Sequence, residues 1–236
     1  MFNANLTNCD QEPIHIPGKI QSHGFLIAID QFYNISFCSE NISNFLPLTA
    51  ASLLNQPLVF FEDHLENSAP SGFLAQLILL GKVGNSIKSV DPYPIEIKGN
   101  VFNLIISISG NQYLLEFEPE YTDLKSDVTR MIGQSLSQIM LNSSLSQLLD
   151  NAAGEIKKVI GYDRVMIYKF HDDGHGEVVA EAKESNLSTF LNLHYPASDI
   201  PKQAKDLYKI NLTRLISDVH TEPSAIVTLK NKETST

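Results

Sequence analysis

Two cysteines are the most reactive side chains in this sequence, and neither has the spacing of a metal site. Cys9 lies in a polar N-terminal stretch, directly before the segment EPIHIPGKIQSHG with its two prolines and two glycines. Cys38 lies in the alternating run FYNISFCSE, which is typical of a strand and makes this cysteine a small buried hydrophobe. Two thiols without a CxxC or CxxH pattern are a poor zinc site. Cys9 is therefore either a free thiol or a point of covalent attachment.

The stretch HDDGHGE (171–177) offers two histidines and three carboxylates, a set that could be mistaken for a metal cluster. Asp-Asp-Gly between two alternating strands is what a tight turn needs, and we interpret it as a turn. His15 and His23 flank a Pro-Gly segment, but two histidines eight residues apart are a weak ligand signal. The motifs GxxxxGK[ST], GxGxxG, HExxH and GxSxG do not occur. The sequence does not predict an enzyme.

Composition predicts a folded, acidic protein. The chain has 236 residues, 43% of them hydrophobic and 19% charged, with a formal net charge of −10. Such a charge without long basic runs argues against nucleic acid or an anionic membrane as a partner. The longest apolar stretch, 72–81, is about half of what a bilayer requires, and the first residues lack a signal-peptide core. We expect a cytoplasmic location, where a Cys9–Cys38 disulfide is disfavoured.

The first half of the chain predicts an antiparallel sheet with helices on one face. Strands are expected at 25–29 and 32–37, joined across Asp30-Gln31, and short helices over 40–81. Further strands are expected at 94–98, 101–109 and 112–119, the last two joined by Gly110-Asn111. Strands, then short helices, then strands indicate an α+β module.

The second half predicts another α+β module. Apolar residues between 124 and 139, and again between 145 and 160, recur at helical spacing, with caps in 141–144 and at Gly161. Such stripes belong to a core or to the seam of a helical dimer. Strands are expected at 163–170, 177–182 and 225–229, and a capped helix within 197–208.

Three blocks together resemble the photosensory region of bacterial phytochromes. They are C-x-x-E-P-I-H-I-P-G-x-I-Q-x-H-G (9–24), YDRVMIYKFHDDGHGEVVAEA (162–182) and YPASDIP (195–201). The resemblance spans nearly the whole chain. It implies a tail at 1–12, a PAS domain at 13–119 and the N-terminal part of a GAF domain at 120–236. It also implies a figure-eight knot between the tail and the GAF domain, in which Ile20 is the apolar plug.

The resemblance implies a pigment. In that family a cysteine at the position of Cys9 forms a thioether with a vinyl group of biliverdin, a linear tetrapyrrole. Members that use a GAF-domain cysteine instead are a different group, and this chain has no cysteine after Cys38. By resemblance, the chain is a red/far-red photoreceptor module that signals by Z/E isomerisation to a downstream histidine kinase. A homodimer formed through helices is also implied.

The resemblance also implies the pigment pocket. Asp199 matches an aspartate whose backbone carbonyl faces the pyrrole nitrogens, and Arg214 matches an arginine that binds a propionate. Tyr195 stands where many relatives have phenylalanine. The other positions that match the pocket of the family are Met166, Tyr168, Ile200, Pro201 and Tyr208.

The sequence departs from the family in two places. Ser22 replaces a common proline, and the GAF domain of the family continues past the point that matches Thr236, so we expect a truncated fragment. Two further hypotheses stay open beside the photoreceptor. One is a pigment-free PAS–GAF module for dimerisation or interaction, and the other is a non-functional fragment. A GAF domain that binds haem or another small ligand is a more distant alternative.

Overall fold

The structure, a computed structural model, contains two compact units. The described residues are 14, 18–65, 69–83, 92–120, 133, 135, 137, 144–210 and 214–229. One unit, called here the seven-stranded unit, holds the described residues 18–120 and 214–229. The other, called here the three-stranded unit, holds the described residues 133–210. Cys9 and His15 lie outside the described residues.

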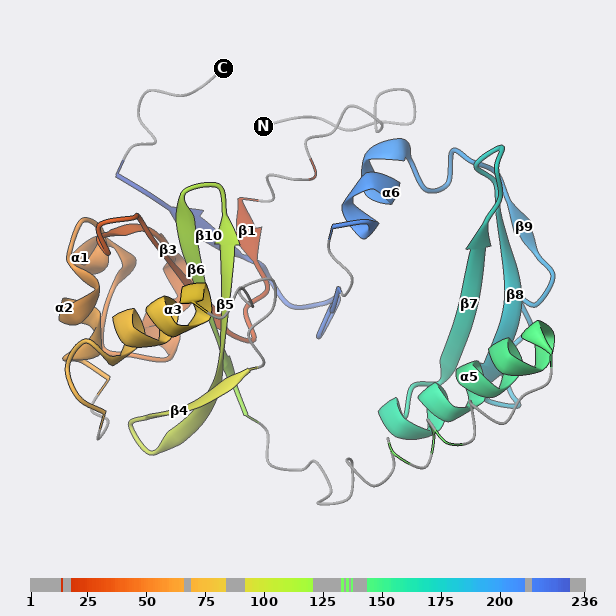
Figure 1. The fold of residues 1–236 in the computed structure, drawn as a ribbon, viewed down its shortest axis with the longest axis horizontal. Coiled ribbons are helices and arrows are strands. Elements are labelled where there is room, and N and C mark those ends of the chain that lie inside the picture. The colour runs from red at the N-terminus through yellow and green to blue at the C-terminus, as the bar shows by residue number, and fades with distance from the viewer. Residues whose placement is uncertain are drawn as a thin grey trace. The chain divides into compact units, whose positions relative to one another are not determined.

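The seven-stranded unit is built on an antiparallel sheet with the order β1-β10-β3-β2-β6-β5-β4 (Figure 1). Its strands in chain order are β1 (Lys19–Ile20), β2 (Phe25–Ile29), β3 (Ile35–Ser39), β4 (Tyr93–Ile97), β5 (Asn100–Ser109), β6 (Gln112–Pro119) and β10 (Ser224–Val227). Successive side chains of a strand point to opposite faces of the sheet. In β6, Tyr113, Leu115 and Phe117 are buried on one face, while the residues between them are half-buried. The predicted hairpin at Gly110 is confirmed, with φ +57° at that glycine.

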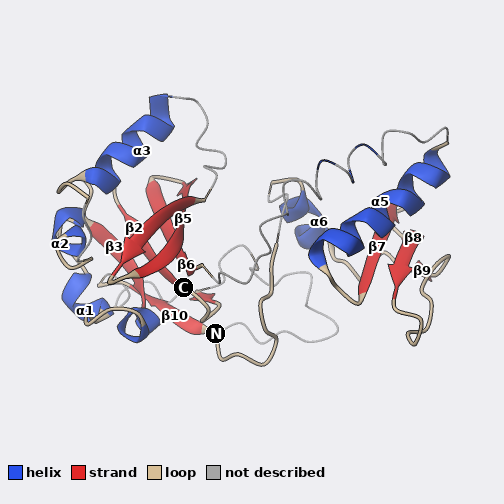
Figure 2. Cartoon of the chain, turned by 90° about the horizontal axis from the view of Figure 1, so that it is seen from below, coloured by secondary structure: helices blue, strands red, loops and turns tan. Residues whose placement is uncertain are grey.

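Helices cover one face of this sheet, as Figure 2 shows. They are η2 (Glu40–Asn44), α1 (Ala50–Leu53), α2 (Leu58–Glu62) and α3 (Phe73–Val83). Between helices and sheet lies an aromatic core, in which the rings of Phe25 and Phe117 stack 4.6 Å apart. The buried Glu62 carboxylate accepts hydrogen bonds from the backbone N–H groups of Gly72 (2.5 Å) and Leu74 (2.7 Å). It thereby satisfies donors at the start of α3, which have no partner within the helix.

The expected strand at 32–37 begins too early. Asp30 Oδ1 accepts from the backbone N–H of Phe32 (2.8 Å) and of Asn34 (2.9 Å), and Tyr33 adopts a positive φ of 63°. This side-chain turn competes with strand pairing, because aspartate bonds readily to the backbone two residues on. The strand therefore starts at Ile35.

The expected strand at 225–229 forms as β10, but the expectation that it belongs to the second sheet was wrong. β10 lies between β1 and β3, with Ile20 opposite Ser224 and Val227 opposite Cys38. Gly18 O accepts from the backbone N–H of Ile226 at 2.9 Å. The chain thus returns to its first sheet after forming the three-stranded unit.

Side chains of the motif QSH (21–23) hold the segment that precedes β10. Gln21 Nε2 donates to Leu215 O (2.5 Å), and Gln21 Oε1 accepts from the Ser217 N–H (2.7 Å). His23 Nδ1 lies 3.0 Å from Ser217 Oγ, and His23 Nε2 lies 3.2 Å from Glu118 Oε1. The His23 ring is therefore engaged at both nitrogens within the seven-stranded unit.

The three-stranded unit has the strand order β7-β8-β9, with β7 at Arg164–Phe170, β8 at Gly176–Lys183 and β9 at His194–Tyr195. Helix α5 (Leu145–Ile160) packs on β7 and β8 (Figure 1). Its predicted caps are confirmed: Ser144 Oγ accepts from Gln147 N–H at 3.3 Å, and Gly161 has φ +71°. Of the helix expected over 124–139, residues 133, 135 and 137 are helical and the rest lie outside the described residues.

Helix α6 (Lys202–Tyr208) forms within the expected 197–208 segment and begins after Pro201. Pro201 is its N-cap, and the residue before a proline is disfavoured in the helical region. Within the described part of the chain, no helix is both long enough and apolar enough to cross a bilayer.

Candidate functional site

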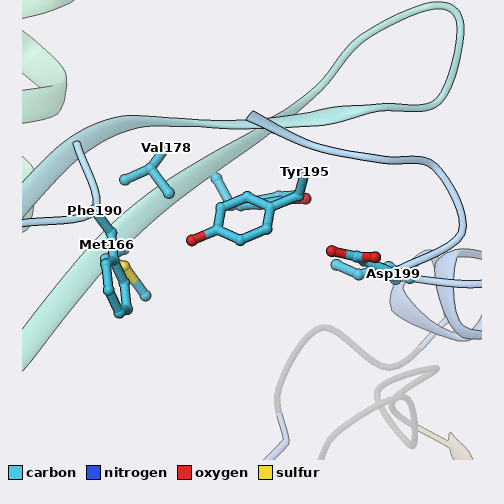
Figure 3. Close-up of a pocket in the computed structure, with 7 residues that line it drawn as sticks. Met166, Val178, Phe190, Tyr195 and Asp199 are labelled. Atoms are coloured by element: carbon cyan, nitrogen blue, oxygen red, sulfur yellow. The ribbon is translucent and has the colours of Figure 1, made fainter. Parts of the chain in front are cut away.

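A cavity of about 200 Å³ opens in the three-stranded unit (Figure 3). Its lining is Met166, Tyr168, Val178, Phe190, Tyr195, Asp199 and Ile200. All but Asp199 are apolar or aromatic. Such a lining with one convergent polar group is typical of a small-molecule site.

The sheet places the side chains of this cavity. Met166 and Tyr168 are two apart on β7, and Val178 is the cross-strand partner of Tyr168. A register shift between Ile167 and Tyr168 locally bends the strand at this point. Tyr195 of β9 pairs with Gly176 at the start of β8. Three strands therefore contribute to one face.

Aromatic rings dominate that face. The Tyr168 ring lies 5.2 Å from the Phe170 ring at 73° and 5.9 Å from the Tyr195 ring at 42°. The pKa of the Tyr168 phenol is raised above its ordinary value, first by burial and then by the Asp199 carboxylate and the Tyr195 phenol. The phenol therefore stays protonated at neutral pH and can donate a hydrogen bond into the cavity.

The segment from Pro196 to Pro201 carries Asp199 to the cavity rim, where Figure 3 draws it beside Tyr195. The backbone N–H of Asp199 donates to Pro196 O at 3.1 Å, which closes a turn. From α6, Lys205 Nζ donates to Gly174 O (2.7 Å) and lies 3.5 Å from Ala197 O. Lys205 thus ties this segment to the turn between β7 and β8.

Phe190 is held by a network around the Glu181 carboxylate. Glu181 accepts from Thr189 Oγ1 (2.6 Å), from the Phe190 N–H (3.1 Å) and from Arg164 Nη1 (2.8 Å). Burial alone would raise the pKa of Glu181, but these hydrogen bonds and the Arg164 charge lower it. The Arg164 guanidinium also lies 3.9 Å from the centre of the Phe190 ring.

The stretch 171–177 forms the predicted turn. His171 N–H donates to His175 O at 2.9 Å, and Gly174 N–H donates to His171 O at 2.8 Å. The His171 and His175 rings stack 4.2 Å apart and nearly parallel, at 4°. The nitrogen lone pairs lie in the ring planes, and parallel planes do not bring them together on one ion. Among the described residues, no group of three or more ligand-type side chains could hold a metal ion.

The structure brings together five of the predicted site residues, namely Met166, Tyr168, Tyr195, Asp199 and Ile200. Pro201 is adjacent as the N-cap of α6, and Tyr208 at the end of α6 is exposed. Ile20 and Arg214 belong to the seven-stranded unit, and Cys9 lies outside the described residues.

Two lining residues were missed from the sequence. Val178 carried a signal, because it alternates with Gly176 and Ala180 along β8 and these three are buried. Nothing in the sequence marked Phe190 as a lining residue. Its position depends on the ion pair between Arg164 and Glu181, which lie on two neighbouring strands.

Comparison with known proteins defines the class. The PAS fold family matches residues 9–120. The chain is 34% identical over 238 residues to cyanobacterial phytochrome B of Nostoc sp., covering 98% of this chain and 31% of that protein. It is also 34% identical over 240 residues to the bacteriophytochrome of Pseudomonas aeruginosa, with the same coverages of 98% and 31%. It is a PAS-containing phytochrome chain.

Solved structures define the class of protein more narrowly. The chromophore-binding domain of Stigmatella aurantiaca bacteriophytochrome superposes with a TM-score of 0.83 at 29% identity, over 96% of this chain and 74% of that one. That of a bacteriophytochrome from R. palustris gives 0.76 at 30% identity, over 92% and 70%. The chain belongs to the bacteriophytochrome family, and its fold matches the PAS–GAF chromophore-binding domain of that family. It spans 31% of the length of the two curated relatives.

Proposed function

We propose that this chain is a light-sensing module that binds biliverdin in the cavity of the three-stranded unit and is attached to it through Cys9. The observation that carries the proposal is the gathering of Met166, Tyr168, Tyr195, Asp199 and Ile200 around one cavity. These are the positions at which the sequence resembles the family's pigment pocket. Red and far-red light would switch the pigment between Z and E forms.

The chemistry of the cavity suits one end of a linear tetrapyrrole. Aromatic and apolar walls favour a planar conjugated ring. Pyrrole N–H groups need an acceptor, and the backbone carbonyl of Asp199 at the rim is the group that the family resemblance assigns to this role. Pockets that bury a whole drug-sized ligand have volumes of roughly 300–1,000 Å³. A cavity of about 200 Å³ therefore suits one ring of the pigment, with the remainder of the pigment outside it.

The state of Cys38 supports Cys9 as the attachment point. Cys38 is fully buried in β3, and burial raises the pKa of its thiol to about 12. The nucleophile in thioether formation is the thiolate, which such a cysteine does not form at neutral pH. The sequence contains two cysteines, so Cys9 is the remaining candidate.

Signal output is part of the same proposal. Isomerisation would change contacts at Tyr168, Tyr195 and Asp199, and the change would pass to a downstream domain such as a two-component histidine kinase. The chain itself would catalyse no reaction. We place it in the cytoplasm, as a homodimer formed through helices.

A pigment-free interaction module is the second candidate, and one observation favours it. Helix α5 exposes Leu145, Ile156 and Ile160, whose relative exposures are 70%, 43% and 45%. Exposed apolar side chains along one helix suit association with another helix. Sedimentation of the chain with and without Ile156→Glu tests association through α5: a dimer that dissociates in the variant supports it, whereas a monomeric parent or an unchanged dimer contradicts it. A chain that dimerises through α5 but attaches no biliverdin supports this candidate over the first.

Covalent attachment is tested by mixing the purified chain with biliverdin, denaturing it, and viewing zinc-enhanced pigment fluorescence on the protein band. Cys9→Ala and Cys38→Ala are the matched variants. We expect a fluorescent band in the parent chain and in Cys38→Ala, and none in Cys9→Ala. Soluble, folded parent chain without a band would contradict pigment attachment, and a band lost only in Cys38→Ala would contradict the choice of cysteine.

A further inference from the structure

Gly176 lies beside aromatic residues that line the cavity. It is the first residue of β8, the middle strand of its sheet, where it pairs with Phe170 on β7 and with Tyr195 on β9. Its neighbour Val178 pairs with Tyr168 and lines the cavity. The residue without a side chain therefore lies among three aromatic ones.

The Tyr168 ring occupies the space that a side chain at Gly176 would fill. A Cβ atom built there would lie 1.9 Å from both Cζ and Oη of Tyr168 and 2.1 Å from its Cε1. Ordinary contacts of a Cβ atom begin at 3.4 Å, so the ring would have to move. The backbone of Gly176 does not adopt a positive φ, so its conformation alone does not call for glycine. The ring is the reason for glycine here.

The ring has few ways to yield. Phe170 meets it edge-on at 5.2 Å on one side, and Tyr195 lies 5.9 Å away on the other. Open space lies away from the strand, in the cavity that Tyr168 lines. A methyl group at position 176 would therefore push the phenol into the ligand space.

We infer that Gly176 is a positioning residue of the pigment pocket. By leaving room for the Tyr168 ring to lie on the β8 backbone, it determines how much of the cavity is open and where the phenol hydroxyl points. This inference rests on the proposed function for its ligand, but its geometric part concerns the chain alone.

Gly176→Ala tests the inference, with Gly154→Ala as the matched control. A Cβ at Gly154 in α5 meets nothing within 4 Å. A misplacement of about 1 Å in a reactive site costs up to about 100-fold in rate. We expect covalent attachment of biliverdin to slow about 10- to 100-fold in Gly176→Ala and the absorption maximum of the bound pigment to shift. Both should stay unchanged in Gly154→Ala.

A double variant distinguishes an effect that acts through the Tyr168 ring from an effect on the backbone at Gly176. When Tyr168→Ala is already present, adding Gly176→Ala should change neither the attachment rate nor the spectrum further, because the clash is gone. An effect of equal size with and without the Tyr168 ring would overturn the inference, as would a Gly176→Ala variant that behaves like Gly154→Ala. The double variant also serves if Gly176→Ala alone fails to fold.

Circular dichroism of the tyrosine band, measured without pigment, tests the positioning role of Gly176 independently of pigment binding. We expect Gly176→Ala to change this band when Tyr168 is present and to leave it unchanged in the Tyr168→Ala background. If this pattern appears but the parent chain attaches no biliverdin, Gly176 positions the ring and the pigment assignment fails. If the pattern is absent, the positioning role fails, whatever the pigment does.

Discussion

The two units differ in how far they bury their apolar side chains. In the seven-stranded unit, one cluster of aromatic and aliphatic residues lies between helices and sheet, with Phe61, Leu115 and Phe117 fully buried. In the described part of the three-stranded unit, the buried apolar residues are Ala153, Val178 and Ala180, and the rings around the cavity keep some exposure. The first unit is stabilised by its own core, whereas the second has a face that a planar ligand would cover.

This difference in burial assigns stability mainly to the first unit and ligand binding to the second. Side chains packed on all sides, such as Phe117, hold one conformation through many contacts. Rings such as Tyr168 and Tyr195 touch neighbours on the sheet and face the cavity on the other side. We therefore expect mutations in the first unit to change folding, and mutations in the second to change ligand response.

The largest expected effect comes from emptying the core of the seven-stranded unit. Phe117→Ala should lower its free energy of unfolding by about 3–5 kcal/mol, because a fully buried ring leaves a cavity. The matched change in the other unit, Phe190→Ala, should cost about 1 kcal/mol, since that ring is half-buried. Native-state hydrogen exchange of β5–β6 and β7–β8 amides measures each unit separately. Equal costs would contradict the contrast.

Ligand binding should stabilise one unit and not the other. In Cys9→Ala, biliverdin binding would be reversible and, at a hundredfold excess over Kd, should stabilise the three-stranded unit by about 2.7 kcal/mol. Hydrogen exchange of the β7–β8 amides should slow accordingly, while that of β5–β6 stays the same. Equal slowing in both units, or slowing in β5–β6 alone, would contradict binding at the cavity.

The seven-stranded unit should show a pH dependence at alkaline pH that comes from Cys38. The folded-state pKa of Cys38, about 12, lies above its ordinary 9.0, so the folded state holds the proton more tightly. The resulting stability is complete below pH 9 and is lost, at about 1.4 kcal/mol per pH unit, as the pH rises toward 12. Urea unfolding of the parent and of Cys38→Ala measures this. A parent slope no steeper than that of the variant above pH 9 would contradict it.

The smallest expected effect concerns the segment before β10. Gln21→Ala removes the hydrogen bonds to Leu215 O, the Ser217 N–H and Ser217 Oγ, and exposed bonds of this kind together contribute about 1 kcal/mol. The Ser217 amide should exchange about fivefold faster. Gln31→Ala, in the exposed turn before β3, is the control and should leave this amide unchanged. No change in Gln21→Ala would show that the Gln21 side chain does not hold the segment.

Local patterns made most of the fold predictable. The β5–β6 hairpin followed from alternating residues on both sides of Gly110-Asn111, and α5 from its apolar spacing between Ser144 and Gly161. The strand after Asp30 was predicted to start too early, because the Asp30 carboxylate accepts hydrogen bonds from backbone N–H groups that would otherwise pair with a strand. Membership of β10 in the first sheet was not predictable, because pairing between residues that are more than 200 apart, such as Ile20 and Ser224, leaves no local trace.

The candidate site was predictable where its residues lie in motifs. Tyr168 and Asp199 stand in stretches whose order and spacing match the family, and the structure brings both to the cavity. Phe190 and Gly176 were missed because their roles depend on contacts across strands, the first through Glu181 and the second through the Tyr168 ring.

Peptide-mapping mass spectrometry of the chain after incubation with biliverdin tests most directly whether the three-stranded unit is a pigment site served by Cys9. The predicted result is the mass of one biliverdin on the peptide that contains Cys9, and none on the peptide that contains Cys38. Soluble, folded chain with both peptides unmodified, or with pigment on the Cys38 peptide, would contradict it.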